Sequence, residues 1–543
     1  MAPAQRLLRA GVLLGRPGGV GAVAVTAGRI VALGADALDA AGPGTEVVDL
    51  GDGLLLPGFT DAHIHAVQGG LERMRCDLSG STGRDDCLRR VAEYASARPD
   101  AAWVTGGGWN QTHFPDGVAT AEELDRVVPD RPVFLPSSSH HMAWVNTRAL
   151  ELAGLDARTP DPADGRIERD AAGTPTGTMH EGAMDMVGRL VPATTAQEYA
   201  EALLVAQEHL HSLGITGWQD AILGRFANID DVGPVYLQAA ERGMLTARVV
   251  GALWWERDRG AEQIPELLER SAWLRAGRFR ASSVKIMQDG VPENGSAAML
   301  DAYLDGCGCT TGNRGHSFVD PVELCRYVTL LDAHGFQVHV HAIGDRAVRE
   351  TLDAFEAARS ANGDTDRRHH IAHLQIVHPD DVPRFGALGV AANMQPLWAT
   401  YEPQMTDLTI PVIGEERAAW QYPFGELART GAPLAAGSDW PVSSADPLAG
   451  VHVAVNRRTP RSVGEPEDRA FLPAQALDLA TALTAYTRGS AHLNHLDDAG
   501  RLEVGALADL AVLDRDPFAH PVAEIGDARV VATYVDGEQV FTR

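Results

Sequence analysis

Short apolar runs interrupted by glycine or aspartate occupy both ends of the chain. Near the start they cover residues 23–26, 29–34 and 46–50, and near the end they cover 508–514 and 530–540. Runs of this length that are rich in Val, Ile and Leu predict short β-strands. Because each set of strands needs a partner to bury its apolar side, we expect the two termini to build one small β-sandwich.

Between these ends, apolar strand candidates alternate with longer helical stretches. This alternation predicts parallel α/β structure. Eight strand candidates can be counted, at residues 54–59, 215–219, 247–252, 283–287, 337–341, 370–374, 390–394 and 433–436. Eight strands followed by helices are what a (β/α)8 TIM barrel requires, and this is the predicted fold class.

The spacing between the first two strand candidates departs from this pattern. About 155 residues separate them, whereas one strand–helix unit needs roughly 30. We therefore expect an inserted subdomain at residues 67–200. The predicted domains are a β-sandwich (1–53 plus 495–543), the barrel (54–66 plus 201–494) and the inserted subdomain, which would shape the substrate pocket.

The amino-acid composition limits the possible binding partners and the cellular compartment of the protein. Hydrophobic residues make up 45% of the 543 positions, which is enough for a large core. The net charge of -27 argues against nucleic acid and against an anionic membrane surface as partners. No stretch is long and apolar enough to span a bilayer. The five cysteines show no paired framework, which favours a reducing cytoplasm.

Residues with metal-ligand side chains stand at the ends of the predicted strands. His63 and His65 close the first strand, and residues two apart in a strand face the same side, so both imidazoles can reach one ion. The carboxyl ends of the strands in a (β/α)8 barrel converge, so ligands on different strands meet there. Six residues form the predicted metal site: His63, His65, Lys285, His341, His373 and Asp439.

Lysine occurs once in this chain. Of the 46 basic residues, only Lys285 is a lysine, and it lies on the fourth predicted strand. An arginine stays protonated in proteins, whereas a buried lysine can lose its proton and act as a nucleophile. A single retained lysine therefore indicates chemistry that a guanidinium cannot perform. The alternative is an ordinary lysine paired with Asp289 or another acid.

Five short motifs carry a resemblance to a known family. They are Gly106-Gly-Gly-Trp-Asn, His141-Met-Ala-Trp-Val-Asn, Val284-Lys-Ile-Met-Gln-Asp-Gly, His341-Ala-Ile-Gly-Asp-Arg-Ala and Gly437-Ser-Asp-Trp-Pro-Val. With them the chain resembles, over nearly its whole length, the amidohydrolase superfamily and its amidohydrolase-3, YtcJ-like branch. Within that branch, the segment that begins at Lys285 is most similar to N-substituted formamide deformylases. One departure is His370-Ile-Ala-His, where the branch usually has Arg-Ile-Glu-His.

The resemblance implies a binuclear metal centre. In superfamily members with a lysine on the fourth strand, CO2 adds to the amine, and the resulting carbamate bridges two divalent cations. Lys285 would carry this carbamate, and we expect zinc as the metal because the ligands are imidazole and oxygen. One ion would be held by His63, His65, Lys285 and Asp439, and the other by Lys285, His341 and His373.

The same resemblance implies a hydrolytic mechanism. A metal-activated hydroxide would attack a carbonyl carbon, while Asp439 would take a proton and pass it to the leaving nitrogen. His339 faces the same side of its strand as His341 and could be the ligand instead. We favour His341 because the family motif begins there.

Three residues of the predicted insertion are candidates for contact with the substrate. His141 and Asn146 match the branch motif, and either could bind the substrate carbonyl or another polar group. Trp109 could form an apolar wall of the pocket. A histidine satisfied within the protein and a tryptophan buried in a core explain the same residues equally well.

The predicted function is hydrolysis of a C–N bond other than a peptide bond, in an acyclic, N-substituted or N-formyl amide. One alternative is a mononuclear deaminase, which needs the histidines and Asp439 but no carbamate. Another is a non-catalytic protein that uses the same fold for binding, against which the intact set of six residues argues. The expected partner is a small-molecule amide, and the superfamily also suggests a homodimer.

Overall fold

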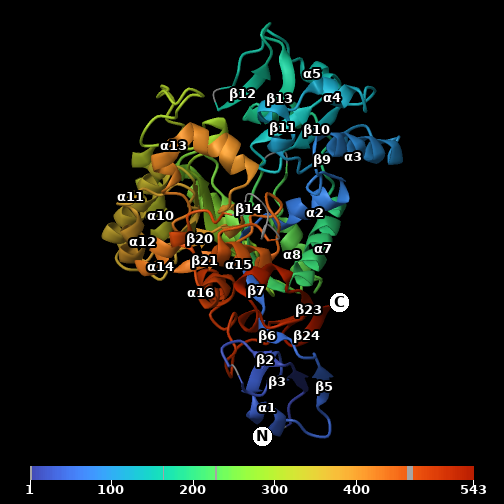
Figure 1. Ribbon diagram of the computed structural model, residues 1–543, viewed down its shortest axis with the longest axis vertical. Helices are drawn as coiled ribbons and strands as arrows, with labels where there is room; N and C mark the ends of the chain where they lie inside the picture. The colour runs from blue at the N-terminus through green and yellow to red at the C-terminus, as the bar shows by residue number, and fades with distance from the viewer. Residues whose placement is uncertain (1–2, 17, 163, 227–228, 461–468) are drawn as a thin grey trace.

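Eight parallel strands form a nearly closed barrel at the centre of the protein, seen here in a computed structural model (Figure 1). The structure describes residues 3–16, 18–162, 164–226, 229–460 and 469–543. The strands follow one another around the barrel in chain order: β7 (Phe59–Ile64), β14 (Ile215–Leu223), β15 (Arg248–Trp254), β17 (Phe279–Met287), β18 (Gln337–Ala342), β19 (His370–His373), β20 (Ala391–Met394) and β21 (Leu434–Ala436). Seven of them overlap a predicted barrel strand over at least three residues, whereas β7 shares only Phe59 with the first predicted strand.

The first barrel strand was predicted at residues 54–59, and this position is wrong. Residues Leu54–Pro57 form β6, which pairs with β22 (Leu510–Leu513) in a different sheet. The barrel strand β7 starts only at Phe59, after Gly58 donates a hydrogen bond to the Asp509 carbonyl (2.8 Å). The prediction relied on apolar residues, but β7 contains polar residues that are also buried, such as His63. For this reason the strand was predicted too early in the chain.

Helices that follow the strands cover the outside of the barrel (Figure 1). They include α7 (Ala196–Ser212), α8 (Gly233–Glu241), α9 (Ile264–Trp273), α10 (Pro321–Ala333), α11 (Asp345–Asn362), α12 (Val382–Leu388), α13 (Ile410–Ala418), α14 (Phe424–Arg429), α15 (Pro447–Asn456), α16 (Leu479–Thr484) and α17 (Ser490–Leu493). Helix α7 shows why such a segment is helical. Thr195 and Glu198 form a capping box at its start, and an apolar face that includes Leu203 and Leu210 is buried against the barrel.

Strands from both chain ends form two further sheets. One contains β1 (Arg6–Arg9), β3 (Ala22–Thr26), β4 (Arg29–Leu33) and β5 (Glu46–Asp49), and the other contains β2 (Val12–Leu13), β6, β22, β23 (Val530–Val535) and β24 (Glu538–Thr542). Leu8 and Val25 of the first sheet share a hydrophobic cluster with Leu510 and Tyr534 of the second. The two ends of the chain therefore share one core. Arg248 of the barrel forms ion pairs with Asp509 and Asp536, which lie beside β22 and β23.

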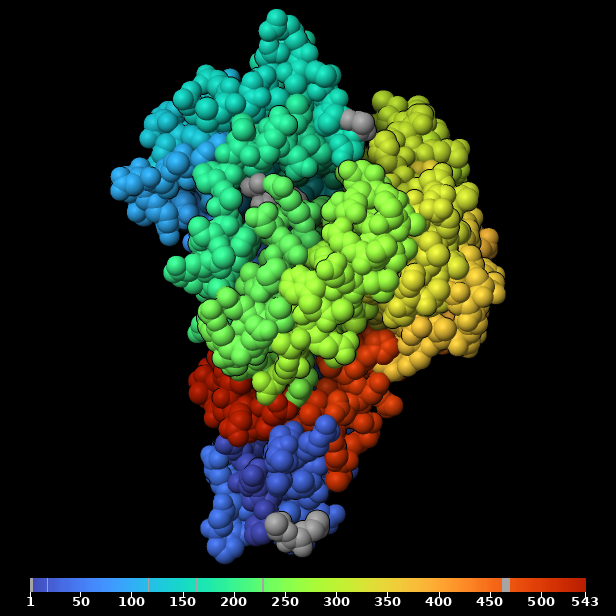
Figure 2. Space-filling model, turned by 180° about the vertical axis from the view of Figure 1, so that it is seen from behind, coloured from blue at the N-terminus to red at the C-terminus, as the bar shows by residue number. Residues whose placement is uncertain are grey.

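The long segment between β7 and β14 builds its own sheet. The strands are β8 (Cys76–Asp77), β9 (Val104–Gly107), β10 (Val133–Pro136), β11 (Met142–Val145), β12 (Gly165–Arg169) and β13 (Pro175–Glu181). The helices are α2 (Ala66–Met74), α3 (Arg84–Ala97), α4 (Ala121–Asp125), α5 (Thr147–Ala153) and α6 (Met184–Gly188). Figure 2 shows this segment at one end of the molecule, the barrel in the middle and the terminal sheets at the other end.

The predicted domain boundaries stay predictions. Strand β6, which lies in the range predicted for the barrel, pairs with β22 in a terminal sheet. None of the described helices combines the length and the apolarity needed to cross a bilayer.

Candidate metal centre

The carboxyl ends of the barrel strands bring the six predicted metal ligands to one cavity of about 530 Å³. His63 lies in β7, and His65 follows it directly before α2. Lys285, His341 and His373 lie near the ends of β17, β18 and β19, and Asp439 follows β21. The cavity contains all six of these side chains in its wall: His63, His65, Lys285, His341, His373 and Asp439.

Three of these side chains already form a compact set of ligand atoms. Asp439 Oδ1 lies 3.0 Å from His63 Nε2 and 3.1 Å from His65 Nε2, and these ligand atoms lie within 4.8 Å of one another. Although these distances are short, the contacts lack the geometry of hydrogen bonds, so Asp439 Oδ1, like His373 Nδ1, is buried without a hydrogen-bond partner. Buried lone pairs that no hydrogen bond uses are suited to a cation, so this donor set fits a divalent metal.

The protonation states also suit metal binding. Burial lowers the pKa of His63 to about 3, so its ring is neutral near pH 7 and can offer a lone pair. Burial opposes ionisation of Asp439, but its interactions with His63 and His65 outweigh this effect and hold its pKa well below the usual range. Neutral imidazoles and an ionised carboxylate are the forms that bind a metal ion.

Lys285 is almost fully buried, with 3% of its surface exposed. Its Nζ lies 3.3 Å from His339 Nε2, and burial lowers its pKa to about 7. A substantial fraction of the amine is therefore neutral at physiological pH, as addition to CO2 requires. No ion pair joins Lys285 to Asp289 among the described residues, so the alternative pairing with this acid has no support.

Asp289 instead organises the neighbouring loop and a histidine. Its carboxylate accepts hydrogen bonds from the backbone N–H groups of Ala298 (3.0 Å), Ile343 (3.0 Å) and Gly344 (2.8 Å). Its Oδ1 also lies 3.2 Å from His341 Nδ1. With Nδ1 facing Asp289, Nε2 of His341 is the nitrogen left for a metal, an arrangement that commonly orients histidine ligands.

His339, the alternative to His341, has a different environment. Its Nε2 lies 2.8 Å from His63 Nδ1, and its ring contacts that of His370 at a tilt of 36°, with the ring centroids 4.1 Å apart. It is fully buried and is not part of the cavity wall, whereas His341 is. His339 therefore contacts the predicted ligand His63 from outside the cavity wall.

Asp61, which the sequence reasoning missed, joins the first and last barrel strands. Its Oδ1 accepts hydrogen bonds from the backbone N–H groups of His63 and Ser438, both at 3.0 Å. The Asp439 N–H donates to the His63 carbonyl (2.8 Å). A Cβ at Gly437 would lie 2.5 Å from the His63 nitrogen, so only glycine permits this approach. These contacts fix two predicted ligands, His63 and Asp439, relative to each other.

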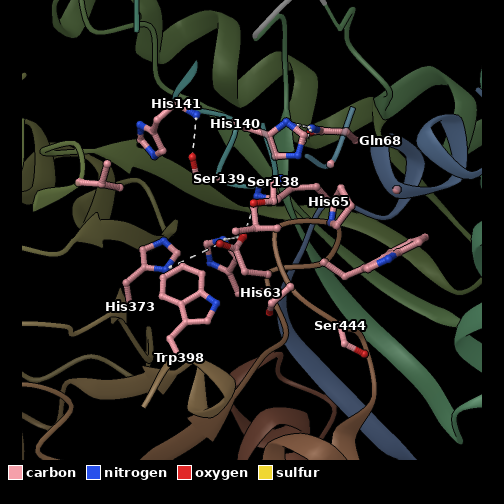
Figure 3. Close-up of a pocket in the computed structure, with 18 of the residues that line it drawn as sticks. His63, His65, Gln68, Ser138, Ser139, His140, His141, His373, Trp398 and Ser444 are labelled. Carbon is pink, nitrogen blue, oxygen red and sulfur yellow. Dashed lines mark hydrogen bonds and ion pairs between the residues drawn. The ribbon is translucent and has the colours of Figure 1, made fainter. Parts of the chain in front are cut away.

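Of the three residues predicted to contact the substrate, only His141 lies in the cavity wall. His141 lines the cavity, and Figure 3 shows it near His140 and above His373 and Trp398. Trp398 stacks on His373 with ring centroids 5.3 Å apart. Trp109 lies outside the cavity wall, fully buried in the core of the inserted segment, where its Nε1 donates to the Leu135 carbonyl (2.7 Å).

Asn146 also lies away from the cavity, at the start of α5. Its side-chain oxygen accepts from the N–H groups of Val133 (3.0 Å) and Ala149 (3.1 Å). Its amide nitrogen donates to the carbonyls of Val128 (3.0 Å) and Arg131 (2.8 Å). All hydrogen-bonding groups of this buried side chain are used within the protein, so none is left for a substrate.

An Asn146→Ala variant is expected to lose stability rather than activity. It removes a helix cap and leaves several buried backbone groups unpaired, which should cost about 2–4 kcal/mol. Urea unfolding followed by circular dichroism would measure this loss. Activity per folded molecule should stay within about 2-fold of the wild type. A raised KM with unchanged stability would instead place Asn146 at the substrate.

Comparison with known proteins identifies one family over nearly the whole chain. Residues 46–541 match the amidohydrolase family. A plant protein, LONG AFTER FAR-RED 3 of Arabidopsis thaliana, is 33% identical over 96% of this chain and 88% of its own length. The putative amidohydrolase YtcJ of Bacillus subtilis is 30% identical over 92% of this chain and 91% of its own length.

Two further similarities bear on function and fold. An N-substituted formamide deformylase of Arthrobacter pascens is 29% identical over 96% of this chain and 95% of its own length. The crystal structure of a metal-dependent hydrolase from Pyrococcus horikoshii superposes with a TM-score of 0.71 at 25% identity, covering 95% of this chain and 99% of that one. The resemblance to the amidohydrolase-3 branch is thus confirmed, and the chain belongs to the amidohydrolase family.

Proposed function

We propose that this protein hydrolyses the C–N bond of an acyclic amide that is N-substituted or N-formylated. The observation that carries the proposal is the convergence of six ligand-type side chains on one cavity at the carboxyl end of the barrel. The similarity to an N-substituted formamide deformylase supports the choice of substrate class. Trp254, Trp398 and Trp440 line the same cavity and suit an apolar substituent on the amide.

The metal site is proposed as binuclear, with zinc as the expected ion. His63, His65 and Asp439 would hold one ion, while His341 and His373 would hold the second. Lys285, carboxylated by CO2, would bridge the two. When bound, such ions lower the pKa of a water molecule and polarise a carbonyl group. The close approach of His63, His65 and Asp439 supports the first site, and the cavity-facing rings of His341 and His373 support the second.

Asp439 is proposed to move the proton of the reaction. Water adds its oxygen to the carbonyl carbon, the C–N bond breaks, and the products are a carboxylic acid and an amine. Ionised Asp439 can accept the proton that the water gives up and deliver it to the leaving nitrogen. Its distance of 3.0 Å from His63 Nε2 and 3.1 Å from His65 Nε2, two predicted metal ligands, supports this role.

Removal and return of the metal test this function. The protein stripped with a chelator is expected to lose activity against N-formyl and N-acyl amides, because the proposed metal ions would lower the pKa of the attacking water. Titration with zinc should restore activity with a plateau near two ions per chain. Circular dichroism of the stripped protein should confirm that it stays folded.

The outcomes separate the alternatives. Full activity at one zinc per chain, with Lys285 unmodified by mass spectrometry, would support the mononuclear deaminase. Absence of any metal-dependent hydrolysis, including that of cyclic amides, would support a non-catalytic binding protein.

We also propose an arrangement of the domains, a location and an oligomeric state. The two terminal sheets would form a β-sandwich domain, and the segment between β7 and β14 would shape the substrate pocket, to which it contributes His140 and His141. A cytoplasmic location and a homodimer remain proposals.

A further inference from the structure

We infer that Glu181 is a positioning residue that holds His141 above the metal centre as a hydrogen-bond donor to the substrate's carbonyl oxygen. The inference rests on the proposed function and gives a role in it to two residues of the inserted segment. A donor aimed at an oxygen that becomes negative during the reaction is often the largest single contribution to catalysis.

His141 has one ring nitrogen anchored and one free. Its Nδ1 bonds to Glu181 Oε1 at 2.8 Å. No described residue forms a hydrogen bond with its Nε2, and the side chain lines the cavity. The ring centroid lies 6.2 Å from that of His341, a predicted metal ligand. The free nitrogen is therefore available to a molecule bound over the metal site.

A structural histidine in the same protein looks different. His211 uses both ring nitrogens within the protein, with Nδ1 2.9 Å from the Ile215 carbonyl and Nε2 2.8 Å from Thr246 Oγ1. It does not line the cavity. In His141, by contrast, Nδ1 is bonded to Glu181 and Nε2 is free at the cavity wall, so Nε2 can form a hydrogen bond with a substrate.

Two barrel-loop residues also hydrogen-bond to Glu181. Its Oε1 accepts hydrogen bonds from Asn294 Nδ2 (2.8 Å) and Ser296 Oγ (3.1 Å) as well as from His141. Asn294 and Ser296 belong to the loop after β17 of the barrel, whereas Glu181 ends β13 of the inserted segment. One carboxylate thus connects the two parts of the molecule at the place where the histidine must be oriented. A carboxylate partner fixes both the tautomer and the direction of an imidazole.

The backbone around this contact is adapted to it. Glu181 has a left-handed conformation with φ of 49°, which is uncommon for a residue with a side chain and is found where surrounding contacts impose it. A Cβ at Gly290 would lie 2.0 Å from Ser296 Oγ and 3.1 Å from Glu181 Oε1. Gly290 closes the motif Gln288-Asp-Gly that follows Lys285, so this motif leaves room for the bond between Ser296 and Glu181.

The charge on Glu181 supports the arrangement. Burial opposes its ionisation, but His141 and the hydrogen bonds of Asn294 and Ser296 lower its pKa to about 2. The carboxylate is ionised at neutral pH, so it accepts a hydrogen bond from the Nδ1–H group of His141. Burial disfavours the charged form of His141, but Glu181 outweighs this effect and raises the pKa of His141 above its usual value. The charged ring that this favours carries a proton on Nε2 as well, so Nε2 can donate toward the cavity.

Kinetics of three variants test the inference. His141→Phe, which keeps a planar ring without a donor, should lower kcat by about 10²–10³-fold with little change in KM. Glu181→Gln should lower kcat by about 10–100-fold. The double variant should be no slower than His141→Phe alone, because Glu181 acts only through His141. The control is Glu168→Gln, since Glu168 pairs with His180 (3.0 Å) in the same hairpin but lies outside the cavity wall.

A binding measurement keeps this test separate from that of the proposed function. Inorganic phosphate, a tetrahedral oxyanion, is titrated into the zinc-loaded protein by calorimetry. His141→Phe and Glu181→Gln should weaken phosphate binding about 10-fold, and Glu168→Gln should not. Equal phosphate affinity in all variants, or no binding to the wild type, would overturn the inference. A double variant that is slower than His141→Phe by the full Glu181→Gln factor would also overturn it, since the two residues would then act independently. If no amide substrate is hydrolysed but His141→Phe and Glu181→Gln still weaken phosphate binding, only the proposed function is overturned.

Discussion

A Lys285→Ala variant is expected to lose about 10³-fold or more of kcat/KM, because it removes the group proposed to bridge the metals that provide the main electrostatic stabilisation. Lys285 is the only lysine of the chain and is 3% exposed in the cavity wall. Its pKa of about 7 keeps part of the amine neutral for reaction with CO2. Steady-state kinetics and metal analysis of the purified variant would measure the loss.

Chemical rescue makes the Lys285 prediction specific. Acetate or propionate can enter the space that the alanine leaves and supply the missing oxygen ligands, so part of the activity should return. Lys285→Arg is the matched control, because its guanidinium cannot form a carbamate and its side chain fills the space. Wild-type activity in either variant without added acid would exclude the bridging role.

An Asp439→Asn variant is expected to lose about 10³–10⁴-fold of kcat, since the amide cannot take the proton that the carboxylate is proposed to accept. The substitution keeps the shape of the side chain but removes the charge that lies 3.0 Å from His63 Nε2 and 3.1 Å from His65 Nε2. Metal bound per chain should fall as well, because a neutral oxygen is a weaker ligand. Kinetics at saturating substrate and elemental analysis would measure the two effects.

Asp446→Asn provides a matched control for Asp439. Asp446 follows seven positions later, and its Oδ1 accepts a hydrogen bond from Leu448 N–H (2.9 Å) at the start of α15. Asparagine caps a helix about as well as aspartate, so this variant should keep both stability and activity. Equal losses in the two variants would mean that Asp439 acts through folding and not through the reaction.

Much of the fold could be predicted because parallel barrel strands are short, apolar and followed by helices. Seven of the eight barrel strands overlap their predicted positions over at least three residues, and the eighth, β7, overlaps only at Phe59. The exception shows the limit of the method. The whole run from Leu54 to Ile64 is buried, so hydrophobicity could not show that one strand ends before Gly58 and another begins after it.

The six predicted metal ligands could be recognised in the sequence because each lies at or near the end of a predicted barrel strand. The contacts that hold them could not be seen, because they join residues far apart in the chain. Asp61 bonds to Ser438 across 377 positions, and Glu181 to Ser296 across 115. No local pattern marks such pairs, since hydrogen bonding of this kind depends on how strands and loops meet in space.

Sequence alone determined the family, the barrel and the residue types that suit a metal centre, because strand periodicity and short motifs are local properties. Only the tertiary structure decided which polar residues face the cavity. It separated His141, which keeps a free ring nitrogen at the cavity wall, from Asn146 and Trp109, whose polar groups bond within the inserted segment. The physical reason is that a buried polar group must find a partner, and whether that partner is the protein or a substrate depends on the packing around it.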